Sequence, residues 1–254
     1  MMKKDQLDKL FVEWKKAHHT EPVDSLLKTI NGDNIDKDFF EIDGIIDEDA
    51  FSKESTKILF ISAEANADEY SAKKGIKETN YCKVYIDYYK SEKDDWKGKM
   101  RERISAIYGC ITNQPDVPFN KLANRFAVMD INKRGGKSTL DGGEHIKCYA
   151  QYYKEFIKRE IEIISPDLIV WIGTNLIKLE IPLIVGFIEK NGILFFETKD
   201  KQIPSISIWQ TSYYQAKIEP LSIYKNRTIG KLCAKAKLEM ESLKQKLPKG
   251  ANHQ

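Results

Sequence analysis

The stretch HIKCYAQYYKEFIKREIEIISPDLIVWIG, residues 145–173, decides the fold class of this chain. Over 145–164, apolar side chains recur at helical spacing and form one stripe. The stripe consists of Tyr149, Tyr152, Tyr153, Phe156, Ile157, Ile161 and Ile164. Pro166 cannot continue a helix, and the apolar segment DLIVWIG, 167–173, starts at once. An apolar run without alternation is typical of a strand buried on both faces, as in a parallel sheet.

Four further apolar runs are similarly short, rich in β-branched or aromatic residues, and bounded by Gly, Pro or polar residues. They are KILFIS (57–62), FAVMDI (126–131), ILFF (193–196) and SISIW (205–209). Helical segments lie between several of them, and a last helix is predicted over about 220–247. Because strands and helices alternate, the sequence predicts an α/β fold, a three-layer sandwich with a short, mainly parallel central sheet.

The domain organisation predicted from the sequence is one α/β domain with an N-terminal extension. Residues 1–56 form a helical and acidic extension packed on the body, with its first helix over 7–14. Its acidic part, 33–49, is expected to be a surface loop wrapped on the body, because its carboxylates lack the regular spacing of a metal site. The apolar residues expected to pack it on the body are Phe39, Phe40, Ile42, Ile45 and Ile46. Residues 57–247 form the α/β domain, and 248–254 form a flexible basic tail.

Composition and charge narrow the class of protein. The 254 residues are 41% hydrophobic and 31% charged with a net charge of +3, which excludes a wholly disordered or collagen-like chain. No apolar run reaches the ~20 residues of a membrane span, and the charged N-terminus does not resemble a signal peptide. The four cysteines form no CxxC pair. We therefore expect a cytoplasmic protein with free thiols and without a metal site or cofactor.

Polar residues follow four of the predicted strands, at the carboxyl ends where α/β sheets bind ligands. The segments are 63–66, 132–139, 173–175 and 210–214. Glu64 is interpreted either as a general base at the mouth of a pocket or as the cap of the next helix. Asn132 can bind both donor and acceptor edges of a ligand, or it can form a turn.

The segment GGKST, 135–139, resembles part of a phosphate-binding loop. The full pattern requires another glycine five positions earlier and a helix afterwards, and neither is present, so nucleotide hydrolysis is not predicted. Two interpretations remain. The segment is a solvated glycine-rich loop, or Lys133, Arg134 and Lys137 contact a nucleic-acid backbone.

Taken in order, these segments resemble the motifs of the uracil-DNA glycosylase superfamily. KILFIS followed by AEAN (63–66) resembles the family's first strand and its Gly-Glu-Ala-Pro-Gly motif. FAVMDINKRGG (126–136) resembles the second strand, which ends in an Asn, and EIISPDLIVWIGTNL (162–176) resembles the family's helix, Pro-Asp, apolar strand and Gly. SISIWQTSYY (205–214) stands where the family has a strand followed by His-Pro-Ser. The resemblance covers about 57–215 and lies in pattern more than in identity.

The resemblance implies that a target nucleotide is flipped out of DNA into a pocket, where Glu64 activates a water against the sugar C1′. It also implies that Asn132 binds the Watson–Crick edge of the base. Gln210 stands in place of the family's His and could donate a neutral hydrogen bond to the departing base. The remaining substrate-binding residues by this assignment are Asn66, Tyr70, Tyr85 and Ser212, and the DNA-binding residues are Lys133, Arg134, Lys137 and Tyr213. Tyr85 is also typical of ordinary helix packing.

The predicted function is hydrolysis of the N-glycosidic bond of a damaged or modified base in DNA, for repair or for defence against modified DNA. Departures from the family motifs at Ala63, Asn66 and 210–212 leave a second hypothesis open, a catalytically silent nucleic-acid- or protein-binding module. A third hypothesis is a small-molecule hydrolase or nucleotide-binding enzyme. Basic and aromatic residues interleaved over 73–103 fit DNA contact, and a solvated helix face explains them equally.

Overall fold

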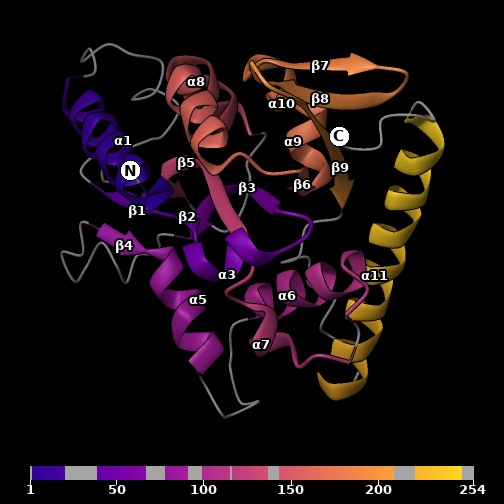
Figure 1. Ribbon diagram of the computed structural model, residues 1–254. Helices are drawn as coiled ribbons and strands as arrows, with labels where there is room; N and C mark the ends of the chain where they lie inside the picture. The colour runs from indigo at the N-terminus through magenta and orange to yellow at the C-terminus, as the bar shows by residue number, and fades with distance from the viewer. Residues whose placement is uncertain are drawn as a thin grey trace.

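A seven-stranded sheet forms the centre of the molecule (Figure 1). The computed structural model describes residues 2–20, 39–66, 78–90, 99–114, 116–136, 143–208 and 221–247. In spatial order the strands are β2 (Gly44–Ile45), β5 (Ala127–Gly136), β3 (Ile58–Asn66), β6 (Leu168–Ile172), β9 (Gln202–Ile208), β8 (Ile193–Glu197) and β7 (Phe187–Lys190). The four strands from β5 to β9 are parallel, as predicted, and the edges are antiparallel, so the sheet as a whole is mixed.

Helices cover both faces of this sheet, which gives three layers (Figure 1). One face carries α1 (Lys3–His19), α8 (Glu144–Ile164), α9 (Thr174–Lys178) and α10 (Ile181–Ile184). The other face carries α5 (Tyr81–Lys90), α6 (Lys99–Ile111), α7 (Phe119–Leu122) and α11 (Leu221–Lys246). Within β3, Leu59 and Ile61 pack toward α1 and α8, whereas Ile58 and Phe60 pack toward α5 and α6. Burial on both faces explains why the strand sequences are continuously apolar, and it confirms the α/β prediction.

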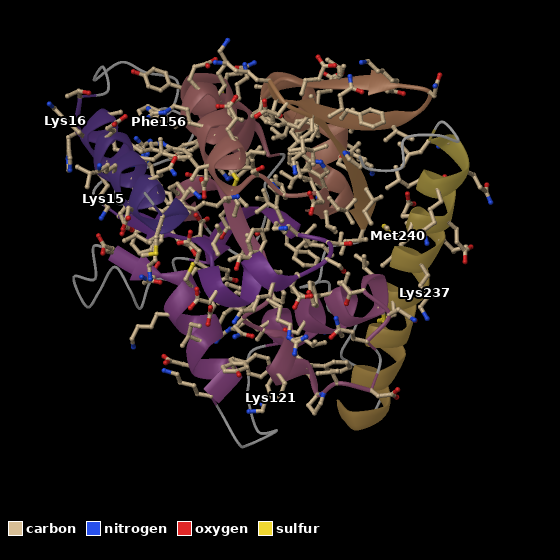
Figure 2. The ribbon with its side chains drawn as sticks, in the orientation of Figure 1. Lys15, Lys16, Lys121, Phe156, Lys237 and Met240 are labelled. Carbon is tan, nitrogen blue, oxygen red and sulfur yellow. A yellow bond between two sulfur atoms is a disulfide. The ribbon has the colours of Figure 1, made fainter. Side chains whose placement is uncertain are left out.

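The N-terminal residues share the core of the molecule. Leu7, Phe11 and Trp14 of α1 belong to the same apolar cluster as the central strands. The Trp14 and Phe156 rings stack with centroids 5.3 Å apart, and Figure 2 shows Phe156 on the side of α8 that faces α1. The prediction of a helix over 7–14 is therefore confirmed.

The acidic segment was expected to be a surface loop, and for its described part this is wrong. Residues 39–49 form β1 (Phe40–Ile42), which pairs with β4 (Glu78–Asn80), and β2, which joins the central sheet. α3 (Glu48–Lys53) follows, with the Asp47 side chain accepting a hydrogen bond from the Ala50 N–H. Because the apolar residues of this segment enter the core, the acidic side chains between them are carried inward, and both Glu41 and Asp43 are buried.

Two of the four cysteines form a disulfide, so the prediction of four free thiols is wrong. Cys110 of α6 is bonded to Cys233 of α11, with Cα atoms 5.7 Å apart and a sequence separation of 123 residues. Cys82 and Cys148 are free. The pairing depends on α6 and α11 packing side by side, which the spacing of cysteines in the sequence does not reveal. None of the helices in the described ranges has the length and apolar character needed to cross a bilayer.

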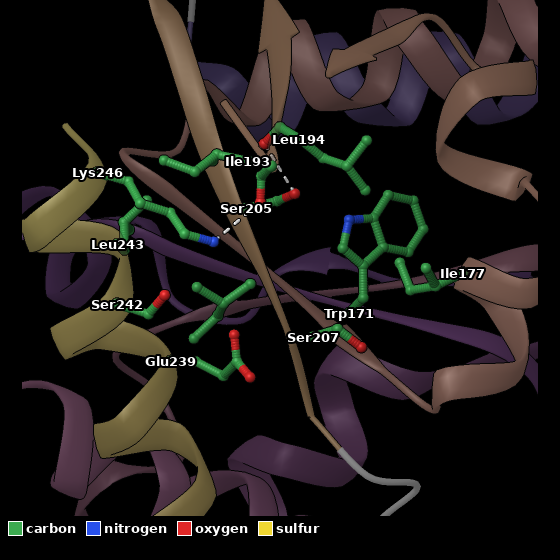
Figure 3. A pocket seen from close by; sticks show the side chains of 12 residues that line it. Trp171, Ile177, Ile193, Leu194, Ser205, Ser207, Glu239, Ser242, Leu243 and Lys246 are labelled. Carbon is green, nitrogen blue, oxygen red and sulfur yellow. Dashed lines mark hydrogen bonds between the residues drawn. The ribbon is translucent and has the colours of Figure 1, made fainter. Parts of the chain in front are cut away.

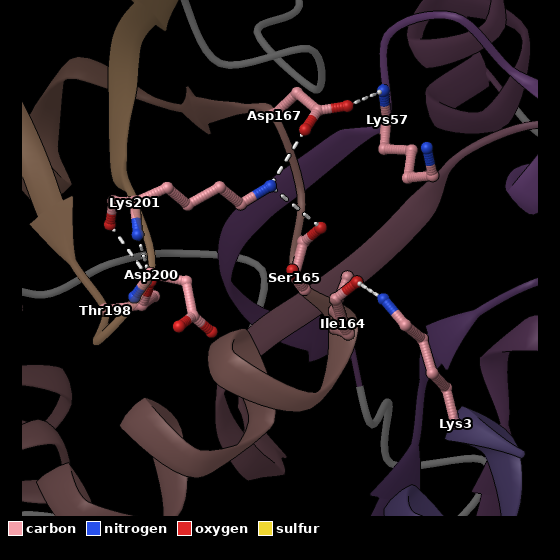
Figure 4. Close-up of polar contacts among 8 residues, drawn as sticks. All are labelled: Lys3, Lys57, Ile164, Ser165, Asp167, Thr198, Asp200 and Lys201. Carbon is pink, nitrogen blue, oxygen red and sulfur yellow. Dashed lines mark hydrogen bonds and ion pairs between the residues drawn. The ribbon is translucent and has the colours of Figure 1, made fainter. Parts of the chain in front are cut away.

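The amino ends of the central strands are tied together by one carboxylate (Figure 4). Asp167, just before β6, accepts hydrogen bonds from the Lys57 N–H at 2.9 Å and from Lys201 Nζ at 2.8 Å. Lys57 precedes β3 and Lys201 precedes β9. On the neighbouring turn, Lys3 Nζ donates to the Ile164 carbonyl at 2.6 Å. These contacts fix the amino end of the sheet, opposite the edge predicted to hold the site.

Candidate functional site

The carboxyl ends of β3 and β5 lie next to each other and bring two of the predicted site residues together. The parallel register pairs Ser62 with Asp130 and, one step further, Glu64 with Asn132. Asn66 then aligns with Gly136 after an irregularity in the pairing. Residues 70, 137, 210, 212 and 213, which carry the predicted roles of Tyr70, Lys137, Gln210, Ser212 and Tyr213, lie outside the described part of the chain.

Asn132 is buried, and its side chain is oriented by the backbone that follows it. Its Oδ1 accepts a hydrogen bond from the Arg134 N–H at 3.1 Å. This is the local bond of an Asx turn, which agrees with the second interpretation of Asn132, that it forms a turn. The bond holds the carboxamide in one orientation, four residues before the end of β5.

Lys133 was predicted to contact DNA, and its position is a correction to that prediction. The side chain is wholly buried and lies between β5, α1 and α8. Its Nζ lies 2.5 Å from both carboxylate oxygens of Asp43 and 3.0 Å from Glu160 Oε2. Burial opposes the charged form of Lys133, but Asp43 and Glu160 outweigh it and raise the pKa of the ammonium. Lys133 is therefore an internal ion-pair partner.

Arg134 also points inward. Its guanidinium carbon lies 5.8 Å from the centroid of the Tyr149 ring and 6.0 Å from that of Tyr153, both on α8. Tyr149 in turn shares a 2.8 Å hydrogen bond with His18 of α1. Burial lowers the pKa of His18 to about 2, so the ring is neutral at any physiological pH. The two consecutive cations thus lie among aromatic rings, where cation–π contact replaces water, and not on a surface open to DNA.

Tyr85, predicted to stack on a base, lies in the core beneath the sheet. Its ring packs edge-on against Tyr81, with centroids 5.4 Å apart, and against Phe126 at 5.6 Å. Burial raises the pKa of its hydroxyl well above the usual range. The structure therefore shows the other interpretation of Tyr85, ordinary helix packing.

The sequence did not reveal a group of buried acids beneath the Glu64–Asn132 pair. Ser62 donates a hydrogen bond to the carboxylate of Asp130, and the Asp130 N–H donates to Asp43 Oδ2 at 2.7 Å. Glu41 of β1 lies near these carboxylates, and it has no exposed surface. Burial, followed by the negative charges of Asp130 and Asp43, raises the pKa of Glu41 well above its usual range. The only sequence signal was a charged residue inside otherwise apolar segments, at Asp130 in FAVMDIN and at Glu41 in FFEI.

Two of the cavities lined by described residues border the sheet. One, of about 140 Å³, lies between α11 and the strands β8 and β9 (Figure 3). Within the described ranges, Trp171 Nε1 and Ser207 Oγ line it without a hydrogen-bond partner. The other, of about 330 Å³, lies between α1, β2 and α5 and reaches Asp43 and Cys82. Burial raises the pKa of the Cys82 thiol, which keeps it in the unreactive thiol form.

Among the residues that the structure describes, no three His, Cys, Asp or Glu side chains gather as metal ligands. The chain matches no protein-family model and no curated protein sequence.

Proposed function

We propose that this protein hydrolyses the N-glycosidic bond of a damaged or modified base flipped out of DNA, on a fold of the uracil-DNA glycosylase type. The observation that supports this most directly is the register that sets Glu64 beside Asn132 at the carboxyl ends of two central parallel strands. Paired strands lie about 4.8 Å apart, so the two residues can act on one bound nucleotide. α/β sheets bind ligands at this edge.

In the proposed reaction, Glu64 takes a proton from a water whose oxygen attacks the sugar C1′. The bond between C1′ and the base nitrogen breaks with its electron pair passing to the base, through a transition state of oxocarbenium character. Gln210 donates a hydrogen bond to the departing base, which stabilises the charge that develops there. Asn132 binds the edge of the base, its carboxamide held by the Arg134 N–H.

DNA is the proposed partner, and the inward position of Lys133 changes which residues would hold it. Because Lys133 neutralises Asp43 inside the protein, the proposal assigns contact with the DNA backbone to Lys137 and Tyr213. A catalytically silent binding module on the same fold is the second candidate. It is favoured by Gln210-Thr211-Ser212 standing in place of His-Pro-Ser.

The test is to incubate the protein with DNAs that contain uracil, deaminated purines, or methylated, hydroxymethylated or glucosylated bases. Free bases are identified by mass spectrometry, and abasic sites by alkaline cleavage. We expect release from at least one DNA, reduced roughly 10²- to 10⁴-fold in Glu64→Gln with DNA binding kept. The matched control is Glu162→Gln, an exposed residue of α8, which should retain full activity.

Equal release by the native protein and Glu64→Gln would contradict the mechanism. DNA binding without release from any of the DNAs would support the binding module instead.

A further inference from the structure

Strand β9 extends past its partner β8, and a pocket lies where the pairing of the two strands ends. The antiparallel register reaches Leu194 opposite Ser205, and β9 then continues to Ile208. The cavity of about 140 Å³ between α11, β8 and β9 lies at this point (Figure 3). Lys246 of α11 donates to the Gly192 carbonyl at 3.4 Å, which links the helix to the turn between β7 and β8. Regular elements of the fold therefore bound the pocket.

Two polar groups line this pocket without a partner, and the strand register sets them side by side. Trp171 of β6 is paired with Ser207 of β9, so their side chains leave the sheet on one face from strands about 4.8 Å apart. Trp171 is 0% exposed, and within the described ranges neither its Nε1 nor Ser207 Oγ has a hydrogen-bond partner. Figure 3 shows the indole nitrogen on the edge of the ring that faces Ser205. Buried polar groups are rarely left unpaired, because their lost hydration is then not replaced.

The preceding serine of the same face shows why Ser207 differs. Because side chains alternate along a strand, Ser205 and Ser207 lie on one side of β9. Ser205 Oγ donates to the carbonyl of Leu194, its register partner on β8, at 3.0 Å. Ser207 lies beyond the last described pair of that register, so the neighbouring strand offers it no equivalent carbonyl. The hydroxyl instead lines the pocket.

Glu239 of α11 adds a hydrogen-bond acceptor to the lining. Its Oε1 accepts from Lys235, and among the described residues none donates to its Oε2. Figure 3 shows the side chain extending from α11 toward β9. An indole N–H can only donate and a carboxylate can only accept, whereas a hydroxyl can do both. A molecule that satisfies the lining therefore needs an acceptor for Trp171 and an N–H for Glu239.

The size and the walls of the pocket restrict the molecule further. A cavity of about 150 Å³ holds one benzene ring, so a single six-membered ring fits. Most of the wall is aliphatic, which suits the two apolar faces of a flat ring and leaves the hydroxyls of a sugar without partners. The aliphatic residues are Ile177, Ile193, Leu194, Ile206 and Leu243.

We propose that this pocket binds a single-ring heterocycle that carries a ring carbonyl and a ring N–H, a compound of the pyrimidinone class. The carbonyl accepts hydrogen bonds from Trp171 Nε1 and the Ser207 hydroxyl, and the ring N–H donates to Glu239. The faces of the ring lie against the aliphatic walls. In the strand order β6 lies between β3 and β9, so the pocket is separate from the edge where Glu64 and Asn132 lie. The inference goes beyond the proposed function and does not rest on it.

The probe for this site is 2-pyridone, a six-membered ring that has both groups. The chain has four tryptophans, and the indole cross-peak of Trp171 in the ¹H–¹⁵N spectrum is identified by its loss in Trp171→Phe. We expect this cross-peak to shift on titration with millimolar 2-pyridone and to reach saturation. N-methyl-2-pyridone has the same carbonyl but no N–H. It should bind about 2- to 10-fold more weakly, the effect of one hydrogen bond.

Two serine variants test which residues hold the probe. Ser207→Ala should raise the dissociation constant of 2-pyridone about 2- to 10-fold. Its urea midpoint should not fall, because the hydroxyl that is removed has no partner within the described part of the protein. Ser242→Phe places a ring in the pocket from α11 and should abolish the shift. Ser52→Ala, which removes an exposed hydroxyl on α3, is the matched control and should bind 2-pyridone as the native protein does.

Three results would overturn the proposal: no shift of the Trp171 cross-peak, equal binding of the two pyridones, or unchanged affinity in both Ser207→Ala and Ser242→Phe. Glu64→Gln separates this pocket from the proposed catalytic edge and should bind 2-pyridone as the native protein does. Binding that is lost in Glu64→Gln and kept in Ser242→Phe would place the probe at the catalytic edge and also overturn the proposal. Base release from DNA is a separate measurement, so the proposed function can fail while this site stands.

Discussion

The two ends of the central sheet differ in how far their paired charged side chains are exposed to water. At the amino end, the Asp167 and Lys201 side chains are each about one third exposed, at 33% and 34%. At the carboxyl end, Asp43 and Lys133 are both 0% exposed, and Glu160 and Glu41 are buried with them. Exposed ion pairs contribute little to stability, whereas buried charges must be paired or neutralised. The ion pair at the amino end therefore only links parts of the fold. At the carboxyl end, charged groups are buried beside the candidate site, which is unfavourable in free energy.

The pKa shifts follow the same division. At the amino end, burial opposes ionisation of Asp167, but hydrogen bonds from Lys201 and the Lys57 N–H outweigh it and lower the pKa. At the carboxyl end, burial and the charge of Asp43 raise the pKa of Glu160 well above its usual range, against the opposing effect of Lys133. The amino end thus favours the charged form of Asp167, whereas burial at the carboxyl end favours the protonated forms of Glu41 and Glu160.

The largest effect is expected from Lys133→Met. Removing the ammonium leaves Asp43 buried without its counterion, and we expect a loss of about 3–5 kcal/mol in the free energy of unfolding. Urea unfolding measures it. Lys201→Met at the amino end is the matched control and should lose no more than about 1 kcal/mol. The double variant Lys133→Met/Asp43→Asn should recover part of the loss, because the buried charge is gone. Similar losses of unfolding free energy in Lys133→Met and Lys201→Met would contradict the difference between the two ends of the sheet.

A smaller effect concerns the stability of the carboxyl end as the pH rises. Because the pKa of Glu160 is raised in the folded protein, the folded state binds more protons than the unfolded state between the two pKa values. Stability should therefore fall as the pH rises through this window, by at most about 1.4 kcal/mol per pH unit. Glu160→Gln should show a shallower decline as the pH rises above the ordinary carboxyl pKa. The urea midpoint of each protein is measured as a function of pH. Identical slopes of midpoint against pH for the two proteins would contradict the prediction.

At the amino end the sign is reversed. The pKa of Asp167 is lowered in the folded protein, so its contribution is present above the ordinary carboxyl pKa and is lost as the pH falls through the folded value. Asp167→Asn should be less stable at neutral pH, by under about 1 kcal/mol given the exposure of the pair. It should approach the native protein below about pH 4. A difference between the two proteins that does not shrink in acid would show that Asp167 acts through geometry alone.

The smallest effect is that of salt. At about 1 M ionic strength the Debye length is ~3 Å, so the partly exposed Asp167–Lys201 pair is screened and the buried Asp43–Lys133 pair is not. The difference in unfolding free energy between the native protein and Lys201→Met should shrink with salt. The difference for Lys133→Met should stay unchanged. Urea titrations at low and high salt compare the two.

Sequence periodicity was sufficient for most of the framework. The five predicted strands and the helices over 145–164 and 220–247 correspond to β3, β5, β6, β8, β9, α8 and α11. The order of the polar segments after the strands also set Glu64 and Asn132 at one edge, where their backbones are paired. These features were predictable because apolar spacing and helix-ending residues act over a few neighbouring positions.

The partners of the charged residues were not predictable. Lys133 and Arg134 were expected at a DNA surface and Glu41 and Asp43 in a surface loop, since charged residues are rarely buried. Lys133 meets Asp43 from 90 residues away, and Cys110 meets Cys233 across 123. By itself the sequence determined the order and type of the strands and helices, because local patterns carry that information. Only the tertiary structure decided which charges leave water, because a charge is buried when distant segments bring it a partner.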